Sequence, residues 1–386
     1  MSRRTAVGID VGTHQIKVVV AAQDGHDQRI RIIGTGQANS RGIRHGYVLN
    51  KDEVVRTLTQ AVEQAEKASG VAIKRAYVSV GGVGLEEVRS RAEVIVARAD
   101  TIVSDLDTKN ALEESERKVS TRLSNRKVIH AIPLAYRLDG ERLLGRPVGM
   151  HGTKLEIESL FITALEQHLN DLIAAVEEVG ISVIDVMASP LAGSFVTLTK
   201  AQKIAGVVLA NIGAETVSIA VFENDIPISV RVFPVGSTDV THDIALGLKI
   251  SLEDADQVKR GALLNTATPK KQLDDIITGR ISDMFLLVEN HLKRLGKNGL
   301  LPAGIVISGG GSGLATVEDI ARAVLKLPSR RATMNVPDTA KVRDSMWAVA
   351  FGLCIWGLTN DHESNSFSTL KENAAGFFGW LKQFLP

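Results

Sequence analysis

Two stretches of the chain carry dense runs of β-branched residues on either side of a short, glycine-containing break. The first is VGIDVGTHQIKVVVA, residues 7–21, and the second is VVLANIGAETVSIAVF, residues 207–222. Such runs around a glycine are typical of two β-strands joined by a tight turn. The stretches align without a gap, with Gly12 over Gly213. A repeat of this length predicts two related domains in one chain.

Each glycine turn leads from one strand directly into another strand. Backbone N–H groups at a turn without bulky side chains can approach a phosphate closely. A Walker A loop and a dinucleotide-binding fingerprint both need a helix after the glycines, so the pattern excludes them. An ordinary structural hairpin is the alternative for either stretch alone, and the duplication favours a shared binding role.

Two further segments follow the second repeat. Residues 241–261 predict helix, and Asp256 and Lys259 project from one helical face, where they suit a ribose or form a solvated ion pair. Residues 304–324, GIVISGGGSGLATVEDIARAV, predict a strand, a glycine run and a helix. Three consecutive glycines let the backbone lie flat against a planar ligand or a phosphate, and an ordinary turn is the alternative.

The overall composition narrows the class of protein. Hydrophobic residues make up 44% and charged residues 23%, as in globular proteins. Lys plus Arg (45) nearly balance Asp plus Glu (44), which argues against a nucleic-acid partner. The single Cys354 favours a reducing compartment, and no apolar stretch approaches the length of a membrane-spanning helix. We expect a multidomain protein of the cytoplasm.

The C-terminal segment, residues 376–386, is unusually rich in aromatic and aliphatic side chains. At 100° per residue these side chains fall within an arc of about 160°. A polar stretch, residues 359–375, precedes them and predicts a flexible linker. The pattern suits a helix lying at the headgroup boundary of a membrane, and packing onto the body or a partner groove is the alternative. The residues expected to meet the membrane are Phe377, Phe378, Trp380, Leu381, Lys382, Phe384 and Leu385.

In their order these elements resemble the actin/Hsp70/sugar-kinase ATPase superfamily, and within it the FtsA family of bacterial cell-division proteins. GIDVGTHQIKVVVA is similar to its first phosphate loop, GLKISLEDADQVKRG to its helix before the nucleotide, and VISGGGSGL to its adenosine motif. WAVAFGL, residues 347–353, resembles its second connecting helix. The resemblance covers nearly the whole chain, including the tail.

The resemblance implies an α/β, actin-like fold. It implies two duplicated RNase H-like domains, with a small subdomain inserted in the first and a C-terminal amphipathic helix. The expected divisions are 1–190, with the insertion at about 83–162; 191–358, with an upper subdomain at about 230–301; a flexible linker at 359–375; and a membrane-targeting helix at 376–386.

The resemblance also implies that ATP and Mg²⁺ bind between the two domains. The nucleotide-binding residues would be Asp10, Gly12, Thr13, His14 and Lys17 in the first phosphate loop, Asn211, Gly213, Ala214, Glu215 and Thr216 in the second, Asp256 and Lys259 at the ribose, and Gly309, Gly310, Gly311 and Ser312 at the adenine. Magnesium would lie near Asp10 through water, as its preference for hard oxygen ligands implies.

Three residues depart from the superfamily pattern. Asn211 stands where relatives carry an acid, Glu215 where they carry glycine, and Ser189 where they carry a glutamate before proline. Glu215 opposes polyphosphate binding unless its side chain points away. Phosphoryl transfer depends on positioned charge and an oriented nucleophile, so the loss of two carboxylates should weaken hydrolysis more than binding. We expect nucleotide binding with weak or no ATPase activity, and we name no catalytic residue.

The function implied by the resemblance is that of a cell-division adaptor. It would self-assemble in actin-like fashion and tether FtsZ filaments, through the FtsZ C-terminal tail, to the cytoplasmic face of the inner membrane at the division site. The upper subdomain would dock that tail, and the inserted subdomain would help to recruit later division proteins. A PilM-like pilus-assembly adaptor and a small-molecule kinase of the same superfamily are the alternatives. The apolar tail disfavours the first, and Asn211 and Ser189 disfavour the second.

Overall fold

The structure is a computed structural model. It describes residues 4–24, 29–261, 270–314, 316–334 and 345–359. The expected amphipathic helix at 376–386, with its membrane-facing residues, and nearly all of the expected linker lie outside these ranges. No helix among the described residues combines the length and apolar character needed to cross a membrane.

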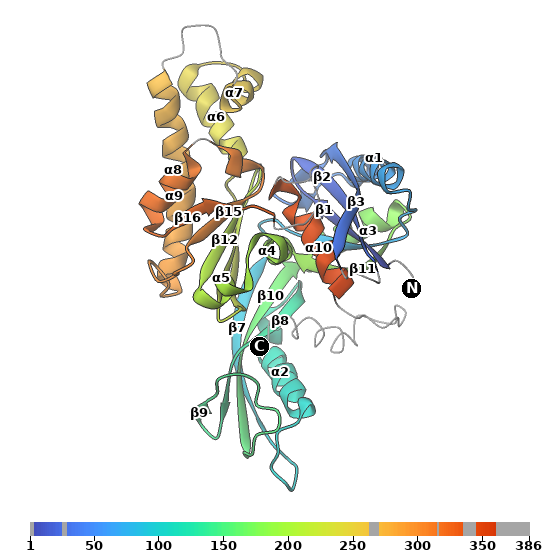
Figure 1. Cartoon of the computed structure of the whole chain (residues 1–386), viewed down its shortest axis with the longest axis vertical. Coiled ribbons are helices and arrows are strands. Elements are labelled where there is room, and N and C mark those ends of the chain that lie inside the picture. The colour runs from blue at the N-terminus through green and yellow to red at the C-terminus, as the bar shows by residue number, and fades with distance from the viewer. Residues whose placement is uncertain (1–3, 25–28, 262–269, 315, 335–344, 360–386) are drawn as a thin grey trace.

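The first domain is built on a five-stranded sheet in the order β11-β6-β1-β2-β3 (Figure 1). β1, β2 and β3 are antiparallel, and β6 and β11 continue the sheet in parallel with β1. The helices α1 and α3 pack beside one another on this domain. The bounds are β1 (Arg4–Val11), β2 (Gln15–Gln23), β3 (Ile30–Asn39), β6 (Arg75–Val80), β11 (Ser182–Ala188), α1 (Lys51–Ser69) and α3 (Glu166–Glu178), with a small hairpin of β4 (Ile43–Arg44) and β5 (Tyr47–Val48).

The second domain repeats this sheet. Its strand order, β16-β15-β12-β13-β14, corresponds strand for strand to that of the first sheet, and the strands run in the same relative directions. The match confirms the duplication and the α/β class predicted from the two hairpin repeats. The bounds are β12 (Val207–Ile212), β13 (Val217–Glu223), β14 (Ile226–Phe233), β15 (Ile305–Ser308), β16 (Ser329–Arg331), α5 (Lys200–Ala205), α6 (Ser237–Leu248), α7 (Leu252–Lys259), α8 (Lys270–Arg294), α9 (Val317–Leu325), and the short 3-10 helices η2 (Gly310–Gly313) and η3 (Ser345–Trp347).

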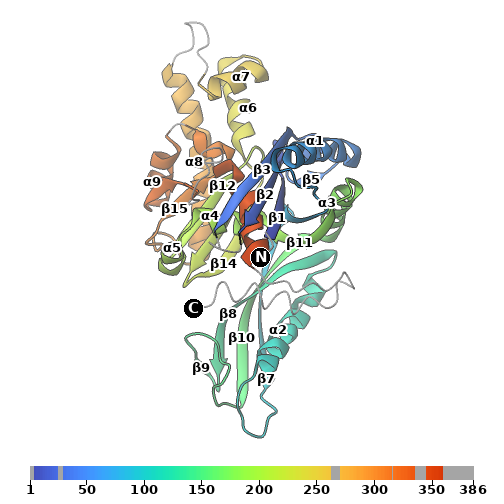
Figure 2. The ribbon, with the colours of Figure 1, turned by 45° about the vertical axis from the view of Figure 1, so that its right-hand side comes forward.

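An additional subdomain, called the insert below, interrupts the first domain between β6 and α3. Its antiparallel sheet has the order β7-β10-β8-β9 and is covered on one face by α2. The insert extends from one end of the molecule, opposite α6 and α7 (Figures 1 and 2). Its elements are β7 (Glu86–Ile95), α2 (Asp105–Val119), η1 (Ser120–Arg122), β8 (Arg126–Leu138), β9 (Glu141–Arg142) and β10 (Lys154–Leu165).

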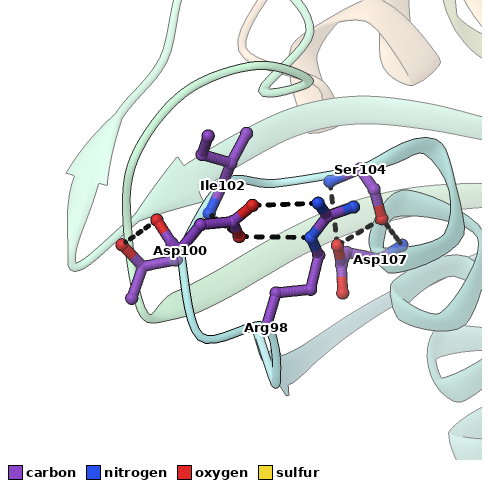
Figure 3. A network of polar contacts seen from close by, with 6 residues as sticks. Arg98, Asp100, Ile102, Ser104 and Asp107 are labelled. Atoms are coloured by element: carbon purple, nitrogen blue, oxygen red, sulfur yellow. Dashed lines mark hydrogen bonds and ion pairs between the residues drawn. The ribbon is translucent and has the colours of Figure 1, made fainter.

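Local polar contacts fix the loop that leads into α2 (Figure 3). The Arg98 guanidinium donates to both carboxylate oxygens of Asp100, at 3.1 and 2.9 Å. Ser104 and Asp107 form a reciprocal capping box at the helix N-terminus, with a Ser104 N to Asp107 Oδ2 distance of 2.8 Å. Because the box satisfies donors that a helix start leaves unpaired, α2 begins at a defined residue.

Two helices cross between the domains. α4 (Ser189–Thr197) follows the last strand of the first sheet and contacts β12 and β13 of the second. α10 (Ala348–Thr359) follows the second domain and contacts β1, β2 and β6 of the first, and it packs against α4. The backbones come very close here, since a Cβ at Gly8 would overlap the Ala350 carbonyl and one at Gly352 would overlap the Ala192 carbonyl. Only glycine permits this approach.

The crossing gives a stability test. Gly8→Ala should lower the free energy of unfolding by about 1–3 kcal/mol or more, because the new methyl must displace the α10 backbone. Gly279→Ala is the matched control, since a Cβ there meets nothing within 4 Å on a helix, and it should raise stability by about 0.5–1 kcal/mol. Urea unfolding of both variants measures the difference. Equal midpoints would contradict the close packing of α10 on β1.

Candidate functional site

The turn of the first hairpin lies between β1 and β2 and carries a half-buried acid at its base. Asp10 and Lys17 are register partners across the hairpin, and the Ser79 hydroxyl on β6 donates to Asp10 Oδ1 at 2.7 Å. Burial raises the pKa of the Asp10 carboxyl, while Lys17 and the Ser79 hydrogen bond act in the opposite direction. The structure therefore brings together the acid and the lysine named from the sequence, and adds Ser79, which sequence reasoning missed.

The tip of this turn, formed by Gly12, Thr13 and His14, is fixed from the end of β3. The Ser40 backbone N–H donates to the His14 carbonyl at 2.9 Å, and the Ser40 hydroxyl donates to the Gly12 carbonyl at 2.5 Å. Burial, followed by the positive charge of Arg260, lowers the pKa of His14. Because Arg260 belongs to the second domain, this turn faces the end of α7 across the domain interface.

The turn of the second hairpin is attached to the start of α6. Gly213 N–H donates to the Thr216 carbonyl at 2.8 Å and closes the turn. Ser237 N–H then donates to the Gly213 carbonyl at 2.9 Å, and Thr238 N–H to the Ala214 carbonyl at 2.8 Å. The N-terminus of α6 therefore lies directly against the predicted second phosphate loop, where its dipole favours an anion.

The predicted ribose pair on α7 is an ion pair within the second domain. Lys259 Nζ lies 2.7 Å from Asp256 Oδ1 and also donates to the Ser237 carbonyl and the Thr241 hydroxyl. Arg260 Nε lies 2.7 Å from the other oxygen of Asp256. Burial acts to raise the pKa of Asp256, but hydrogen bonds and charges from Lys259 and Arg260 lower it overall. Arg260, whose side chain is 61% exposed, is a second residue that the sequence reasoning missed.

The glycine run packs against the end of β12. Gly309 has φ +85°, and a Cβ there would overlap Asn211 Oδ1, while one at Gly311 would overlap the Ile212 side chain. A Cβ at Gly310 would meet nothing within 4 Å, so the run is open at that residue. Inside the run, the Ser312 hydroxyl donates to the Gly309 carbonyl at 2.7 Å. Asn211 and the glycine run therefore form one surface of the second domain.

Ser189 lies at the start of α4, below the end of β6. Its side chain is buried, and a Cβ at Gly81 would come within 2.8 Å of its hydroxyl. The small hydroxyl lies between the end of β6 and the start of α4, where the family resemblance leads us to expect a carboxylate. Neither Ser189 nor Asn211 can supply an anion for orienting a nucleophile, as the sequence indicated.

Glu215 reaches out of the second turn to the other domain. Its Oε1 lies 2.8 Å from Arg44 Nε, and its Oε2 accepts a hydrogen bond from the His45 backbone N–H at 2.6 Å. Both partners belong to the β4–β5 hairpin of the first domain, and neither was named from the sequence. The carboxylate is paired with a cation instead of facing its own turn.

These residues fit a nucleotide with a magnesium ion. Lys17 and His14 of the first domain and Arg260 of the second offer positive or polar groups to a polyphosphate across the domain interface. Among the described residues no group of three or more His, Cys, Asp or Glu forms a metal site. The single carboxylate of Asp10 is compatible with Mg²⁺, which retains several waters and is held largely by phosphate oxygens.

Comparison with known proteins places this arrangement in a family. A model described as "Cell division protein FtsA" matches residues 208–352, and one described as "SHS2 domain inserted in FTSA" matches residues 84–163, together more than half of the chain. The chain belongs to the FtsA family. The cell division protein FtsA of Bacillus subtilis (strain 168) is 29% identical over 375 residues, covering 92% of this chain and 83% of that protein.

Solved structures confirm the actin-like fold. The "PilM-PilN type IV pilus biogenesis complex" matches with a TM-score of 0.70 at 16% identity, covering 92% of this chain and 98% of the other. MreB5 of Spiroplasma citri bound to ADP matches with a TM-score of 0.51 at 12% identity, covering 92% and 96%. At these identities the likeness establishes the fold alone. The match to the SHS2 domain model, residues 84–163, coincides with the insert.

The half-buried acid provides a test of the site's electrostatics. Asp10→Asn should raise the thermal midpoint at neutral pH, because a raised pKa means that the native state penalises the ionised carboxyl relative to the unfolded chain. The penalty is present above the folded-state pKa and vanishes as the pH falls below that of an ordinary aspartate, about 3.9, so the gain should shrink on acidification. Differential scanning fluorimetry across this pH range measures it.

Asp139→Asn is the matched control for that experiment. Hydrogen bonds from Thr153 and the Lys154 backbone N–H lower the pKa of Asp139, so its ionised form is favoured in the native state. Removing this charge should lower the midpoint at neutral pH. A lower midpoint for Asp10→Asn would contradict the burial penalty at Asp10.

Proposed function

We propose that this FtsA family member is a cell-division adaptor that binds ATP with Mg²⁺ between its two domains. It assembles with copies of itself in actin-like fashion and links FtsZ filaments to the cytoplasmic face of the inner membrane. The observation that carries the nucleotide part is the duplicated hairpin pair. One turn is flanked by Asp10 on β1 and Lys17 on β2, and the other is attached to the N-terminus of α6.

ATP hydrolysis is weak or absent in this proposal. Asn211 packs against the glycine run, and Ser189 is buried at the start of α4, so neither position places a carboxylate near the phosphates. Nucleotide then serves as a binding signal between the two domains. A small-molecule kinase is disfavoured for the same reason, because it needs a catalytic base at its acceptor.

The membrane part rests on the sequence of residues 376–386. Six large apolar side chains at roughly 1.5–3 kcal/mol each give a gross gain of about 9–18 kcal/mol on full burial. Partial immersion, helix ordering and lost association entropy remove much of this gain. One tail therefore binds weakly and reversibly, and several tails on one filament bind through avidity.

The proposed protein partners are assigned to the two subdomains at opposite ends of the molecule, the upper subdomain and the insert. The upper subdomain, with α6, α7 and α8, is proposed to receive the FtsZ C-terminal tail, and the insert to recruit later division proteins. Two basic residues of the upper subdomain are already paired, Arg280 with Asp243 at 2.6 Å and Lys293 with Glu289 at 2.9 Å. Lys249 and Lys270 are exposed and better suited to an acidic peptide.

Lys17→Ala tests the nucleotide site. It should weaken ATP binding by roughly tenfold to a hundredfold, because a charge-assisted contact contributes about 1.5–3 kcal/mol. Lys51→Ala is the control, since Lys51 pairs with Glu178 on the surface of the first domain and should leave affinity unchanged. Isothermal titration calorimetry with Mg²⁺ measures affinity, and phosphate release should stay near background. Failure of the unmodified protein to bind ATP would rule out the nucleotide part.

Liposome co-sedimentation tests the membrane part. The full chain should pellet with anionic vesicles, and a truncation ending at Ala374 should stay in the supernatant, with and without ATP. Trp380→Glu on the apolar face should abolish binding, whereas Gln383→Glu adds the same charge on the opposite face and should reduce it only slightly. If all forms stay in the supernatant, the tail docks on protein and a pilus-type actin-fold adaptor becomes the better reading.

A further inference from the structure

Glu215 connects the second phosphate turn to the first domain with two different kinds of contact. Its side chain is 13% exposed, while that of Arg44 is 64% exposed. The ion pair alone therefore contributes little, because its cation is well solvated. The hydrogen bond from the His45 backbone N–H, at 2.6 Å to a mostly buried carboxylate oxygen, is the stronger contact. His45 Nδ1 also lies 3.3 Å from the Glu215 backbone carbonyl.

The β4–β5 hairpin that receives Glu215 is itself firmly attached to the first domain. The His45 carbonyl accepts a hydrogen bond from Val83 N–H at 3.2 Å. The backbones of Gly46 and Gly82 are in such close contact that a Cβ on either would overlap the other. Residue 83 immediately precedes the insert, so the contact made by Glu215 continues, through one loop, to the base of the insert.

The backbone turn that carries this carboxylate is the one to which the proposed nucleotide would bring its phosphates. The turn that carries Glu215 is the one attached to the N-terminus of α6, and its partners lie on the opposite domain. The chain therefore contains an anion of its own that joins the two domains. Superfamily members with glycine here have no side chain that could do so.

We propose that Glu215 holds the two domains together through Arg44 and the His45 backbone N–H when no nucleotide is bound, and that ATP must displace it. The first half of this proposal stands on the contacts above, and the second half rests on the proposed nucleotide site. The two domains are then held together in the nucleotide-free protein. Nucleotide replaces an internal anion and signals through the Val83 loop to the insert.

The distance between the domains tests the first half. Spin labels at Gln60→Cys on α1 and Leu246→Cys on α6 report the separation of two exposed helices on different domains (Figures 1 and 2). The native Cys354 is buried and burial raises its pKa to about 12, so it escapes labelling. Without nucleotide the parent should give one narrow distance distribution, and Glu215→Ala should give a longer or broader one.

Graded and control variants make the distance result specific. Glu215→Gln keeps an acceptor for the His45 N–H but loses the charge, so it should lie between the parent and Glu215→Ala. Arg44→Ala should broaden the distribution only slightly, because its ion pair with Glu215 is well solvated. Glu223→Gln breaks a comparable ion pair with Lys297, at 2.6 Å within the second domain, and should change nothing. Identical distributions for the parent and Glu215→Ala would overturn the proposal.

Affinity for ATP tests the second half. Removing the internal anion in Glu215→Ala should tighten ATP binding by about tenfold, which corresponds to the loss of one competing contact of about 1.4 kcal/mol. Glu223→Gln should bind as the parent does. Equal or weaker binding by Glu215→Ala overturns displacement by ATP. If no form binds ATP, the proposed nucleotide site fails, and the distance measurement still decides whether Glu215 holds the domains together.

Discussion

The structure depends on the crossing of α4 and α10 between the two domains. Each helix leaves one sheet and buries itself on the other, so neither domain has a complete core without its neighbour. The contact is made backbone to backbone at Gly8 and Gly352, which fixes how closely the domains approach at this point. Because α4 and α10 both cross here and pack on each other, this one contact sets how the two domains are joined.

Charge placement follows from that geometry. Asp10 is half-buried beside Lys17 and hydrogen-bonded to Ser79, in a place where its ionised form is costly. Stability alone would favour a neutral residue there. An acid whose ionised form lowers the stability of the fold is typical of a binding site. Glu215 shows the opposite arrangement, because its carboxylate is stabilised by partners on the other domain.

The sequence predicted the parts of the fold and site that depend on local patterns. The two hairpins, their duplication and the glycine run follow from strand alternation and turn composition. Asp10 and Lys17 were named from the family resemblance, and their pairing across the hairpin is a finding of the structure. Ser79 and Arg44 were missed because they reach the site from distant elements through tertiary contacts that no spacing encodes. Arg260 adjoined a predicted pair and could have been found from its position one residue after Lys259, on a helix already assigned to the site.

The three departures from the superfamily pattern make sense when they are considered together. Asn211 and Ser189 remove carboxylates that would serve turnover, and Glu215 adds one that joins the domains. An enzyme that cycles needs its domains to open after each reaction, and an internal anion that keeps them together opposes opening. An adaptor that must stay assembled while it holds other proteins has no such need. In the proposed function, a nucleotide that is bound but not hydrolysed competes with the Glu215 carboxylate and so gives a reversible signal without chemistry.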